Sequence, residues 1–568
     1  MRNVSRRNFM KAAAVGAMGM AAMGVAGCSP SEKAGATDTA EPAASSATDW
    51  LGSAPDVDES ALTETIDCDI LVVGLGTAGH FAAMSAVESG AKVVAIEKGD
   101  VGGFGIRYQL GGINTQLQKT APNEDGTVGI EIDRNAITED FSRYSNYYNR
   151  ADLIHLWYDH SAKALDLYID LEREAGLNPH LINYSGNPEA SWKAWTTGHE
   201  VKDSDTMKIY EPVEKYIIDG GGDLRFKTSL VKLVQDESGA VTGAYAQTEA
   251  GDYLKINAAK GVVVCTGGYA QNLDMMKALQ PQTCDLYSWI AAPPTNVGDG
   301  IKACLWAGAV QDQNHSSMLF ERTMVPPDAL GGNESVGIAK EFLAGSQPWL
   351  SVDLEGKRFC NEAGPYDYRL HAVNNRPGHT YITLLDSDFT RHFTAYDTIG
   401  CSRTLPIANW NGTETEMGPD KIERRVKVLT EEGTYVQQAD TWEELAEKLN
   451  IPADNLVATV ERYNKMCEQG YDEDFGKDPY RLVPYVKPPF YGVRTTGRLL
   501  CTFDGIRIND KVQALKADGE PVDGLYCAGN DSGGFFEFTY PNLATGCAGG
   551  RSATLGYVAV KNALGEEL

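Results

Sequence analysis

Residues 70–79 read ILVVGLGTAG, a short apolar run with β-branched residues that opens into a glycine-rich turn. The next ten residues, 80–89, are rich in alanine and favour a helix, and 92–97 (KVVAIE) return as a second apolar run that ends in an acid. Strand, glycine turn, helix and strand together make a βαβ unit. A G-x-G-x-x-G turn in that context is typical of dinucleotide binding.

The glycines of this turn have separate tasks. Gly74 permits the tight turn, Gly76 lets the backbone approach a pyrophosphate, and Gly79 lets the helix pack close to the strand. Thr77 and Ala78 belong to the first turn of the helix, where free N–H groups and a partial positive charge suit phosphate. We therefore expect all five residues to belong to the cofactor-binding site.

Glu97 ends the second strand, about 20 residues after the turn, where a carboxylate accepts hydrogen bonds from ribose hydroxyls. It begins the run EKGDVGG at 97–103, and LGGIN follows at 110–114. With these runs the chain resembles the fumarate reductase/succinate dehydrogenase flavoproteins, the FAD-dependent oxidoreductase 2 family, in which they wrap FAD. The resemblance implies further FAD contacts at Lys98, Gly102, Gly103, Gly111, Gly112 and Ile113.

Two later runs also resemble motifs of this family, VVVCTGG at 262–268 and GLYCAGN at 524–530. They imply FAD contacts at Thr266, Gly267, Gly268, Gly529 and Asn530, the last of which stands where many members have glutamate. Asn542 is retained from another family motif. Gly546 starts an alanine-rich C-terminal helix, whose N-terminus would favour the anionic reduced flavin. Members with covalent FAD carry a histidine before G-G-I-N; residues 103–110 contain none, so we expect non-covalent FAD.

The resemblance, which runs from about residue 67 to 563, predicts an α/β fold with a Rossmann-like FAD-binding domain and an inserted α+β capping domain. The FAD motifs at both ends assign residues 62–305 and 491–568 to the first domain and 306–490 to the cap. Residues 436–449 and 454–469 are expected to form two surface helices near the end of the cap. A cap that closes over a cofactor excludes water and brings groups to the substrate.

The N-terminus resembles an export address. Residues 5–11 (SRRNFMK) are similar to a twin-arginine signal, and VAGC at 25–28 is similar to a lipoprotein cleavage box. We expect 1–28 to be the signal, with Cys28 lipidated, and 29–61 to be a flexible linker; the alternative is a plain signal peptide. No other stretch approaches 18 consecutive apolar residues, so we expect a lipoprotein on the outer face of the cytoplasmic membrane, attached only through Cys28.

Composition excludes several other classes of protein. With 568 residues and 42% hydrophobic content, the chain is long and apolar enough for two or three folded domains. A formal net charge of −28 disfavours nucleic acid as a partner. The 11 cysteines are scattered without a C-x-x-C pair, and no metal-ligand pattern is found. An iron–sulfur site built from distant cysteines stays an open alternative.

The residues that clamp dicarboxylates in the resembled family are missing here. The run GKRFCNE at 356–362 matches, but the arginine that acts as the family's proton donor is replaced by Tyr366. The family's H-P-T stretch is replaced by Met318 and its neighbours, and His315 is expected to be an unrelated polar residue. A carboxylate-binding arginine near the C-terminus reads Leu543. Burying a dianion without cations is costly, so fumarate and succinate are disfavoured as substrates.

Two tyrosines are the candidate catalytic residues. Tyr366 stands at the proton-donor position, and a phenol with a pKa of ~10 serves as a general acid when it is aligned; the alternative is a core or lid tyrosine. Tyr540 lies in TYPN at 539–542, which resembles a segment of the 3-ketosteroid dehydrogenases, relatives that use tyrosines to polarise an enone. The aromatic run 535–538 (FFEF) suits a flat apolar substrate, or else belongs to the core.

These observations predict an exported FAD-dependent reductase that transfers hydride from flavin N5 to an activated C=C bond. The acceptor would be a small enone, unsaturated lactone or acrylate-type molecule rather than fumarate. Lacking a haem motif, the chain would depend on an external electron donor, such as a membrane cytochrome or a quinol-linked protein. The alternatives are a desaturase similar to 3-ketosteroid dehydrogenases, and a flavin-bearing electron-relay or binding protein without turnover of its own.

Overall fold

A computed structural model describes residues 50–102, 109–122, 126–182, 190–192, 194–201, 207–392, 396 and 419–568. All of them lie within one compact unit, Ala47–Leu568, which two large β-sheets and one small sheet organise. The predicted signal, its arginines and Cys28 lie outside the described residues. Within the described part, no helix has both the length and the apolar character needed to cross a membrane.

The first sheet has eight strands and is built around a parallel core. Strand β1 lies between β9 and β2, with β18 beyond β9 and β6 beyond β2, and all of these neighbours run parallel. Antiparallel pairs β17·β18, β7·β8 and β8·β9 complete it. The strand bounds are β1 Leu62–Val73, β2 Val93–Ile96, β6 Asp223–Arg225, β7 Thr228–Gln235, β8 Val241–Thr248, β9 Tyr253–Val264, β17 Gln513–Leu515 and β18 Pro521–Cys527.

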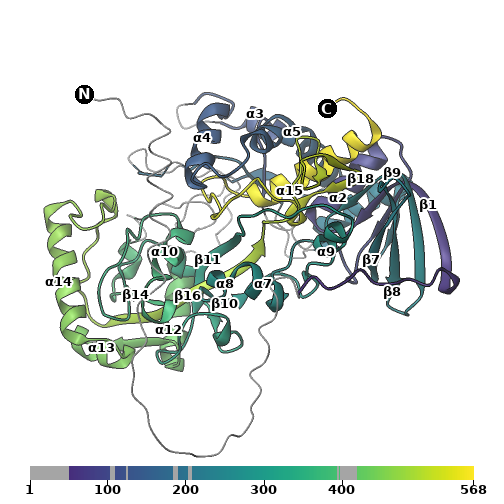
Figure 1. Cartoon of the computed structure of the whole chain (residues 1–568). Coiled ribbons are helices and arrows are strands. Elements are labelled where there is room, and N and C mark those ends of the chain that lie inside the picture. The colour runs from purple at the N-terminus through teal and green to yellow at the C-terminus, as the bar shows by residue number, and fades with distance from the viewer. Residues whose placement is uncertain are drawn as a thin grey trace, which may run out of the picture. The chain divides into compact units, whose positions relative to one another are not determined.

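The central strands are buried on both faces. Ile70, Leu71, Val72 and Val73 expose at most 1% of their surface, as expected for parallel strands covered on two sides. Helix α2 (Thr77–Glu88) follows the glycine turn, and α15 (Cys547–Leu564), from the other end of the chain, packs against it (Figure 1). The two ends of the sequence therefore build one domain.

The rest of this half comprises further helices and a small three-stranded sheet in the order β3-β5-β4. The strands of the small sheet are β3 Leu110–Gly111, β4 His180–Leu181 and β5 Gly198–Glu200. The helices are α3 Gln116–Thr120, α4 Arg134–Tyr144, α5 Ala151–Glu174, α6 Met207–Asp219, α7 Leu273–Leu279, α8 Pro281–Cys284 and α9 Asp299–Trp306.

The second sheet has seven strands, and its centre is the long strand β16, which pairs with four others: β10, β11, β14 and β15. The bounds are β10 Tyr287–Ile290, β11 Ser317–Met324, β12 Lys340–Glu341, β13 Ser351–Val352, β14 Tyr381–Leu385, β15 Val436–Ala439 and β16 Phe490–Thr502. The sheet therefore includes two segments outside the predicted cap of residues 306–490. Strand β10 lies before residue 306, and β16 extends past residue 490 into the segment predicted to belong to the FAD-binding domain.

Four helices pack with the second sheet: α10 (Tyr366–Val373), α12 (Pro419–Glu432), α13 (Trp442–Leu449) and α14 (Ala453–Gln469). Neighbouring residues of β14 enter different cores, because successive side chains of a strand point to opposite faces. Leu384 packs in the core that α13 and α14 cover, and Leu385 in the core that contains Val426 of α12.

One predicted helix of the cap starts later than expected. The prediction of a helix over 436–449 was wrong for its first residues, because 436–439 form β15 along β16. Helix α13 begins only after Thr441, whose hydroxyl accepts a hydrogen bond from the backbone of Glu444. The helix predicted at 454–469 is confirmed as α14.

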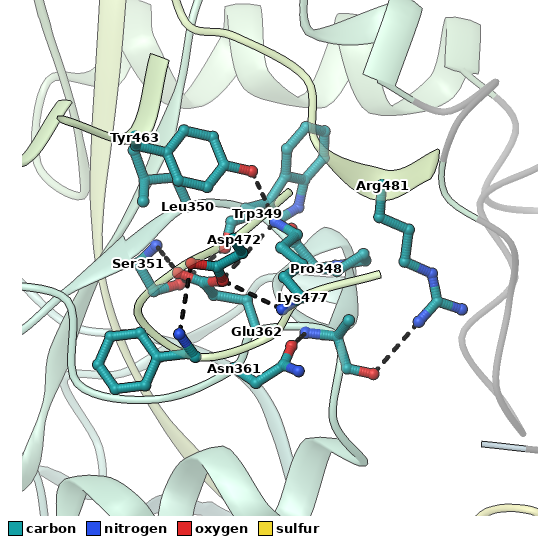
Figure 2. A network of polar contacts seen from close by, with 12 residues as sticks. Pro348, Trp349, Leu350, Ser351, Asn361, Glu362, Tyr463, Asp472, Lys477 and Arg481 are labelled. Carbon is teal, nitrogen blue, oxygen red and sulfur yellow. Dashed lines mark hydrogen bonds and ion pairs between the residues drawn. The ribbon is translucent and has the colours of Figure 1, made fainter. Parts of the chain in front are cut away.

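A buried cluster of charges lies inside the cap. Arg358 donates to both carboxylate oxygens of Glu362, at 2.9 and 2.8 Å, and to both of Asp472, at 3.0 and 2.9 Å. Its side chain is 4% exposed, and the two carboxylates are no more than 1% exposed. Lys477 joins them through Glu362 and donates to the Tyr463 hydroxyl at 2.9 Å (Figure 2).

At Asp472, the effect of Arg358 on the pKa of the carboxyl group is larger than the opposing effect of burial. Burial alone would raise the pKa of Asp472, but the hydrogen bonds and charge of Arg358 hold that pKa at about 2. Both carboxylates are therefore charged at neutral pH, and the cluster is balanced only while the guanidinium is present.

Replacing Arg358 with methionine should destabilise the cap strongly, because Asp472 then has no ion-pair partner among the described residues and Glu362 keeps only Lys477, at 3.8 Å. Breaking a buried pair costs about 3–5 kcal/mol. Urea unfolding of the Arg358→Met variant measures the loss. Arg462→Met is the matched control: Arg462 is 52% exposed and pairs with Asp474 at the surface, so its loss should cost no more than about 1 kcal/mol. Equal losses in the two variants would contradict this role of Arg358.

Candidate cofactor and active site

Three loops meet at the carboxyl edge of the first sheet. They follow the parallel strands β1, β9 and β18 and carry Gly74–Gly79, Thr266–Gly268 and Gly529–Asn530. Ligands of open parallel sheets bind outside the carboxyl ends of the strands. The structure therefore gathers at one edge the cofactor residues predicted from three distant segments.

The first turn has the geometry that a dinucleotide cofactor requires. Gly74 adopts φ 94°, and a Cβ there would lie 2.6 Å from the Cys265 carbonyl oxygen. A Cβ on Gly79 would lie 1.8 Å from the Gly74 carbonyl oxygen, so helix and strand touch at this point. A Cβ on Gly76 would meet no atom within 4 Å. The space in front of Gly76, at the N-terminus of α2 where Thr77 and Ala78 begin the helix, fits a phosphate group.

Glu97 lies directly beside this turn. Its two carboxylate oxygens accept hydrogen bonds from the backbone N–H groups of Leu75 at 2.8 Å and Gly99 at 2.7 Å. Each oxygen keeps a lone pair for a ribose hydroxyl. Lys98 forms an ion pair with Asp299, with 2.7 Å between its ammonium and the carboxylate, next to Glu97.

The second loop is organised by Asp531, a residue that the sequence analysis did not identify. Its buried carboxylate accepts from the Thr266 hydroxyl at 2.8 Å and from the Gly268 N–H at 3.0 Å, and also from the N–H groups of Thr266 and Gly267. Burial raises its pKa despite these bonds. The only sequence signal was an acid directly after the predicted contact Asn530.

The far end of the site is formed where β3 meets the start of α15. The Gly111 N–H donates to the Gly546 carbonyl at 2.7 Å, and a Cβ on Gly550 would lie 1.6 Å from the Gly111 carbonyl oxygen. Gly112 and Ile113 continue this wall, their N–H groups donating to the Thr197 carbonyl and the Ser161 hydroxyl.

Asn542 is a buried residue whose side-chain amide fits a bound ligand. It is 1% exposed, and neither polar atom of its side-chain amide has a hydrogen-bond partner within the described residues. Buried amides are nearly always hydrogen-bonded, so these atoms fit a bound polar group. Gly102 lies against His80 and Leu75 near the glycine turn, whereas Gly103 lies outside the described residues. Together these loops and walls fit FAD.

The two candidate tyrosines are linked through Asp367. Tyr366 is the first residue of α10, and its side chain lies outside the described part of the structure. The next residue, Asp367, accepts from the Tyr144 hydroxyl at 2.9 Å and from the Tyr540 backbone N–H at 3.0 Å. The first turn of α10 is thereby attached to the segment that leads from Asn530 to α15. Burial raises the pKa of Asp367 to about 7.

Tyr540 itself lies in an aromatic wall. Its ring is 5.2 Å from Phe536 and 6.0 Å from Phe503, and its hydroxyl accepts from the Ala548 N–H in the first turn of α15 at 3.2 Å. Phe535 and Phe536 are buried, while Phe538 is partly exposed and adopts φ 61°. The aromatic run thus contains buried rings that belong to the core and one partly exposed ring.

His315 is not isolated, although the sequence analysis set it aside. Its Nδ1 lies 2.5 Å from a carboxylate oxygen of Asp504, which is fully buried and also accepts from the Tyr269 hydroxyl at 2.6 Å. The adjacent residue Phe503 contacts Tyr540, so this pair lies close to the aromatic wall. A sequence gives no signal for a partner that is 189 residues away.

Substitutions at two glycines of the first turn should separate cofactor binding from folding. Gly76→Val fills the open space, so the protein should fold with near-normal stability but lose most of its FAD. Gly79→Ala drives a methyl group into the Gly74 carbonyl and should cost about 1–3 kcal/mol of stability. The FAD-to-protein ratio and the thermal midpoint of each variant measure the two effects. An FAD-replete Gly76→Val variant would show that the phosphates do not lie here.

Comparisons with known proteins agree with this geometry. The family model for the FAD binding domain matches residues 69–546. The vinyl phenol reductase of Lactiplantibacillus plantarum is 28% identical over 85% of this chain and 93% of its own length. The 3-oxosteroid 1-dehydrogenase of Mycobacterium tuberculosis is 31% identical over 57% of this chain and 56% of its own.

The solved structure of the open conformation of a flavocytochrome c3 fumarate reductase has the same fold, with a TM-score of 0.59 at 23% identity over 89% of this chain and 79% of that one. The predicted α/β class with a Rossmann-like FAD-binding domain is confirmed, as is the cofactor FAD. The likeness to fumarate reductases and, in part, to ketosteroid dehydrogenases is confirmed as well. The chain belongs to the FAD binding domain family, and it is an FAD-dependent oxidoreductase.

Proposed function

We propose that this protein reduces an activated C=C bond of a small organic acceptor, such as an enone, an unsaturated lactone or an acrylate-type molecule, and that fumarate is not its substrate. The observation that carries the proposal is the attachment of α10 to the Tyr540 segment through Asp367. It brings the predicted proton donor, Tyr366, to the segment that runs between two predicted flavin contacts, Asn530 and Gly546. Bound FAD would supply hydride from its N5 atom.

The residues of the chain would supply the proton and the orientation. Tyr366, at the N-terminus of α10, would donate the proton as a general acid. Asp367 holds that first turn in place through its bonds to Tyr144 and Tyr540. Phe503, Phe536 and the ring of Tyr540 offer an apolar wall that suits a flat acceptor.

The buried arginines of the nearby cap support a neutral or weakly charged acceptor. Arg369 is 3.3 Å from the carboxylate of Glu321 and also donates to backbone carbonyls, including that of Glu362 at 3.0 Å. Arg322 donates to the Ser346 hydroxyl at 2.7 Å. Arginines that already have these hydrogen-bond and ion-pair partners are poorly suited to bind a dicarboxylate, which needs several cations that can pair with it.

Export is part of the same proposal. The arginine pair at 6–7 and the cysteine at 28 support a twin-arginine lipoprotein on the outer face of the cytoplasmic membrane. Such a protein would receive electrons from a membrane cytochrome or a quinol-linked donor. The FAD would be non-covalent, since residues 103–110 contain no histidine.

A second candidate function is desaturation of a steroid, the reverse direction of the same chemistry. It is favoured by Tyr540 in its T-Y-P segment and by the likeness to the 3-oxosteroid 1-dehydrogenase. Acceptor dependence distinguishes the two functions: a desaturase reduces its own flavin with a saturated ketosteroid, whereas the proposed enzyme oxidises its flavin with an unsaturated acceptor.

Anaerobic reoxidation tests the proposal directly. The protein, isolated without its first 48 residues, is reduced with a viologen and then mixed with fumarate, urocanate, a cinnamate, a vinyl phenol, a steroid enone or an unsaturated lactone in turn. We expect rapid reoxidation by one of the neutral or aromatic acceptors and none by fumarate. Rapid reoxidation by fumarate would overturn the proposed acceptor class and point to a cationic clamp formed elsewhere in the cap.

Tyr366→Phe should lower turnover of the identified acceptor by ~10²-fold or more while FAD stays bound, because the phenol proton is lost. Tyr471→Phe is the matched control: Tyr471 is 54% exposed in the same cap and bonds only Glu473 among the described residues, so turnover should not change. Near-normal turnover by the Tyr366 variant would refute its role as the acid.

A further inference from the structure

A buried cation lies directly behind the cofactor residues of the third loop. Arg551, in the second turn of α15, is completely buried. Its guanidinium donates to the side-chain carbonyl of Asn530 at 2.9 Å and to the backbone carbonyl of Ser532 at 3.3 Å. It also lies over the rings of Phe535 and Phe536, at 5.9 and 5.1 Å. All of these partners are neutral.

No carboxylate within the described residues forms an ion pair with Arg551. The buried carboxylate whose charge acts on Arg551, Asp531, uses both oxygens for hydrogen bonds on the loop at Thr266–Gly268. The Nε of Arg551 has no hydrogen-bond partner in the described part of the chain. By contrast, Arg358 and Arg369, which are also buried, each have a carboxylate within 3.3 Å.

The charge persists in spite of its burial. Loss of water lowers the pKa of Arg551 to about 10, which still leaves the guanidinium protonated at neutral pH. A positive charge in a medium of low dielectric acts over longer distances than one in water. The N-terminal dipole of α15, which starts four residues earlier at Cys547, adds to it with the same sign.

Asn530 connects this charge to the cofactor edge. It follows β18, next to the loop after β9 and the first turn of α2: a Cβ on Gly529 would be 3.1 Å from the Cβ of Ala78. An aspartate or glutamate at position 530 would neutralise Arg551 where the neutral amide does not. The wall of the flavin site behind Asn530 therefore contains a buried guanidinium that has no ion-pair partner among the described residues.

We propose that Arg551 is a positioning residue that holds Asn530 and supplies the flavin site with a positive charge that no ion pair neutralises within the described residues, favouring the anionic form of the reduced flavin and raising the reduction potential. Two electrons would then enter with one proton rather than two. A higher potential eases reduction by a weak external donor and restricts the acceptors to activated double bonds. The inference rests on FAD binding and is independent of the acceptor.

The decisive comparison uses Asn530→Asp and Asn530→Gln, because both keep Arg551 and differ in one charge. For each FAD-loaded variant, the equilibrium constant of flavin reduction is measured against a reference dye by anaerobic spectroscopy between pH 6 and 8. We expect the Asp variant to have a constant at least tenfold lower than the Gln variant, about 30 mV for a two-electron couple. The dependence of its potential on pH should steepen from one proton per two electrons toward two.

Two further variants distinguish charge from packing. Arg551→Lys keeps the charge and should keep the wild-type proton count. Lys561→Met removes a cation from the far end of α15, where Lys561 pairs with Glu88 at 2.9 Å and Glu566 at 3.1 Å, and should leave the potential unchanged. Equal reduction constants and equal pH slopes for the two Asn530 variants would overturn the proposal. Neither readout requires turnover, so failure of every organic acceptor would reject the proposed function and leave this inference standing.

Discussion

The close contact of α15 with α2 and β3 is the constraint on which the cofactor site depends. A Cβ on Gly556 would lie 2.1 Å from the Ala78 carbonyl oxygen, and one on Gly550 would lie 1.6 Å from that of Gly111. The last helix can therefore approach the first only without side chains at these points. This approach brings the loop after β18 to the glycine turn after β1, so residues separated by more than four hundred positions form one wall.

The same constraint explains how much the sequence could predict. The βαβ unit is local: the apolar run, Gly74, Gly76, Gly79 and Glu97 all lie within residues 70–97, and the structure forms the predicted strand, helix and strand there. The wall made by Gly111 and Gly546 was accessible only through a family resemblance, because nothing in the local pattern says that these glycines meet. The helix over 436–449 was predicted to start too early, although the sequence itself contains the signal for the true start, the capping threonine at 441.

The sequence did not predict residues whose partners lie far away in the chain. Asp531 and Asp367 each follow a predicted site residue, but their importance lies in partners far away in the chain, such as Thr266 and Tyr540. Carboxylates of this kind look like ordinary surface acids in a sequence with 78 acidic residues. Arg551 was missed for the complementary reason, since its significance lies in the absence of an ion-pair partner among the described residues. Only the surroundings of a buried charge reveal whether it is neutralised.

Strand β16 has a consequence for how this family can change. It forms the centre of the cap sheet, yet its last residue, Thr502, receives a hydrogen bond from the Tyr269 N–H at 3.1 Å, directly after the cofactor loop at Thr266–Gly268. The cap is therefore not a separate unit. Recombination at its two chain boundaries could not exchange it between relatives without disturbing the cofactor loop. A new specificity must arise by substitutions within the existing cap, or by replacement of cap and cofactor loop together.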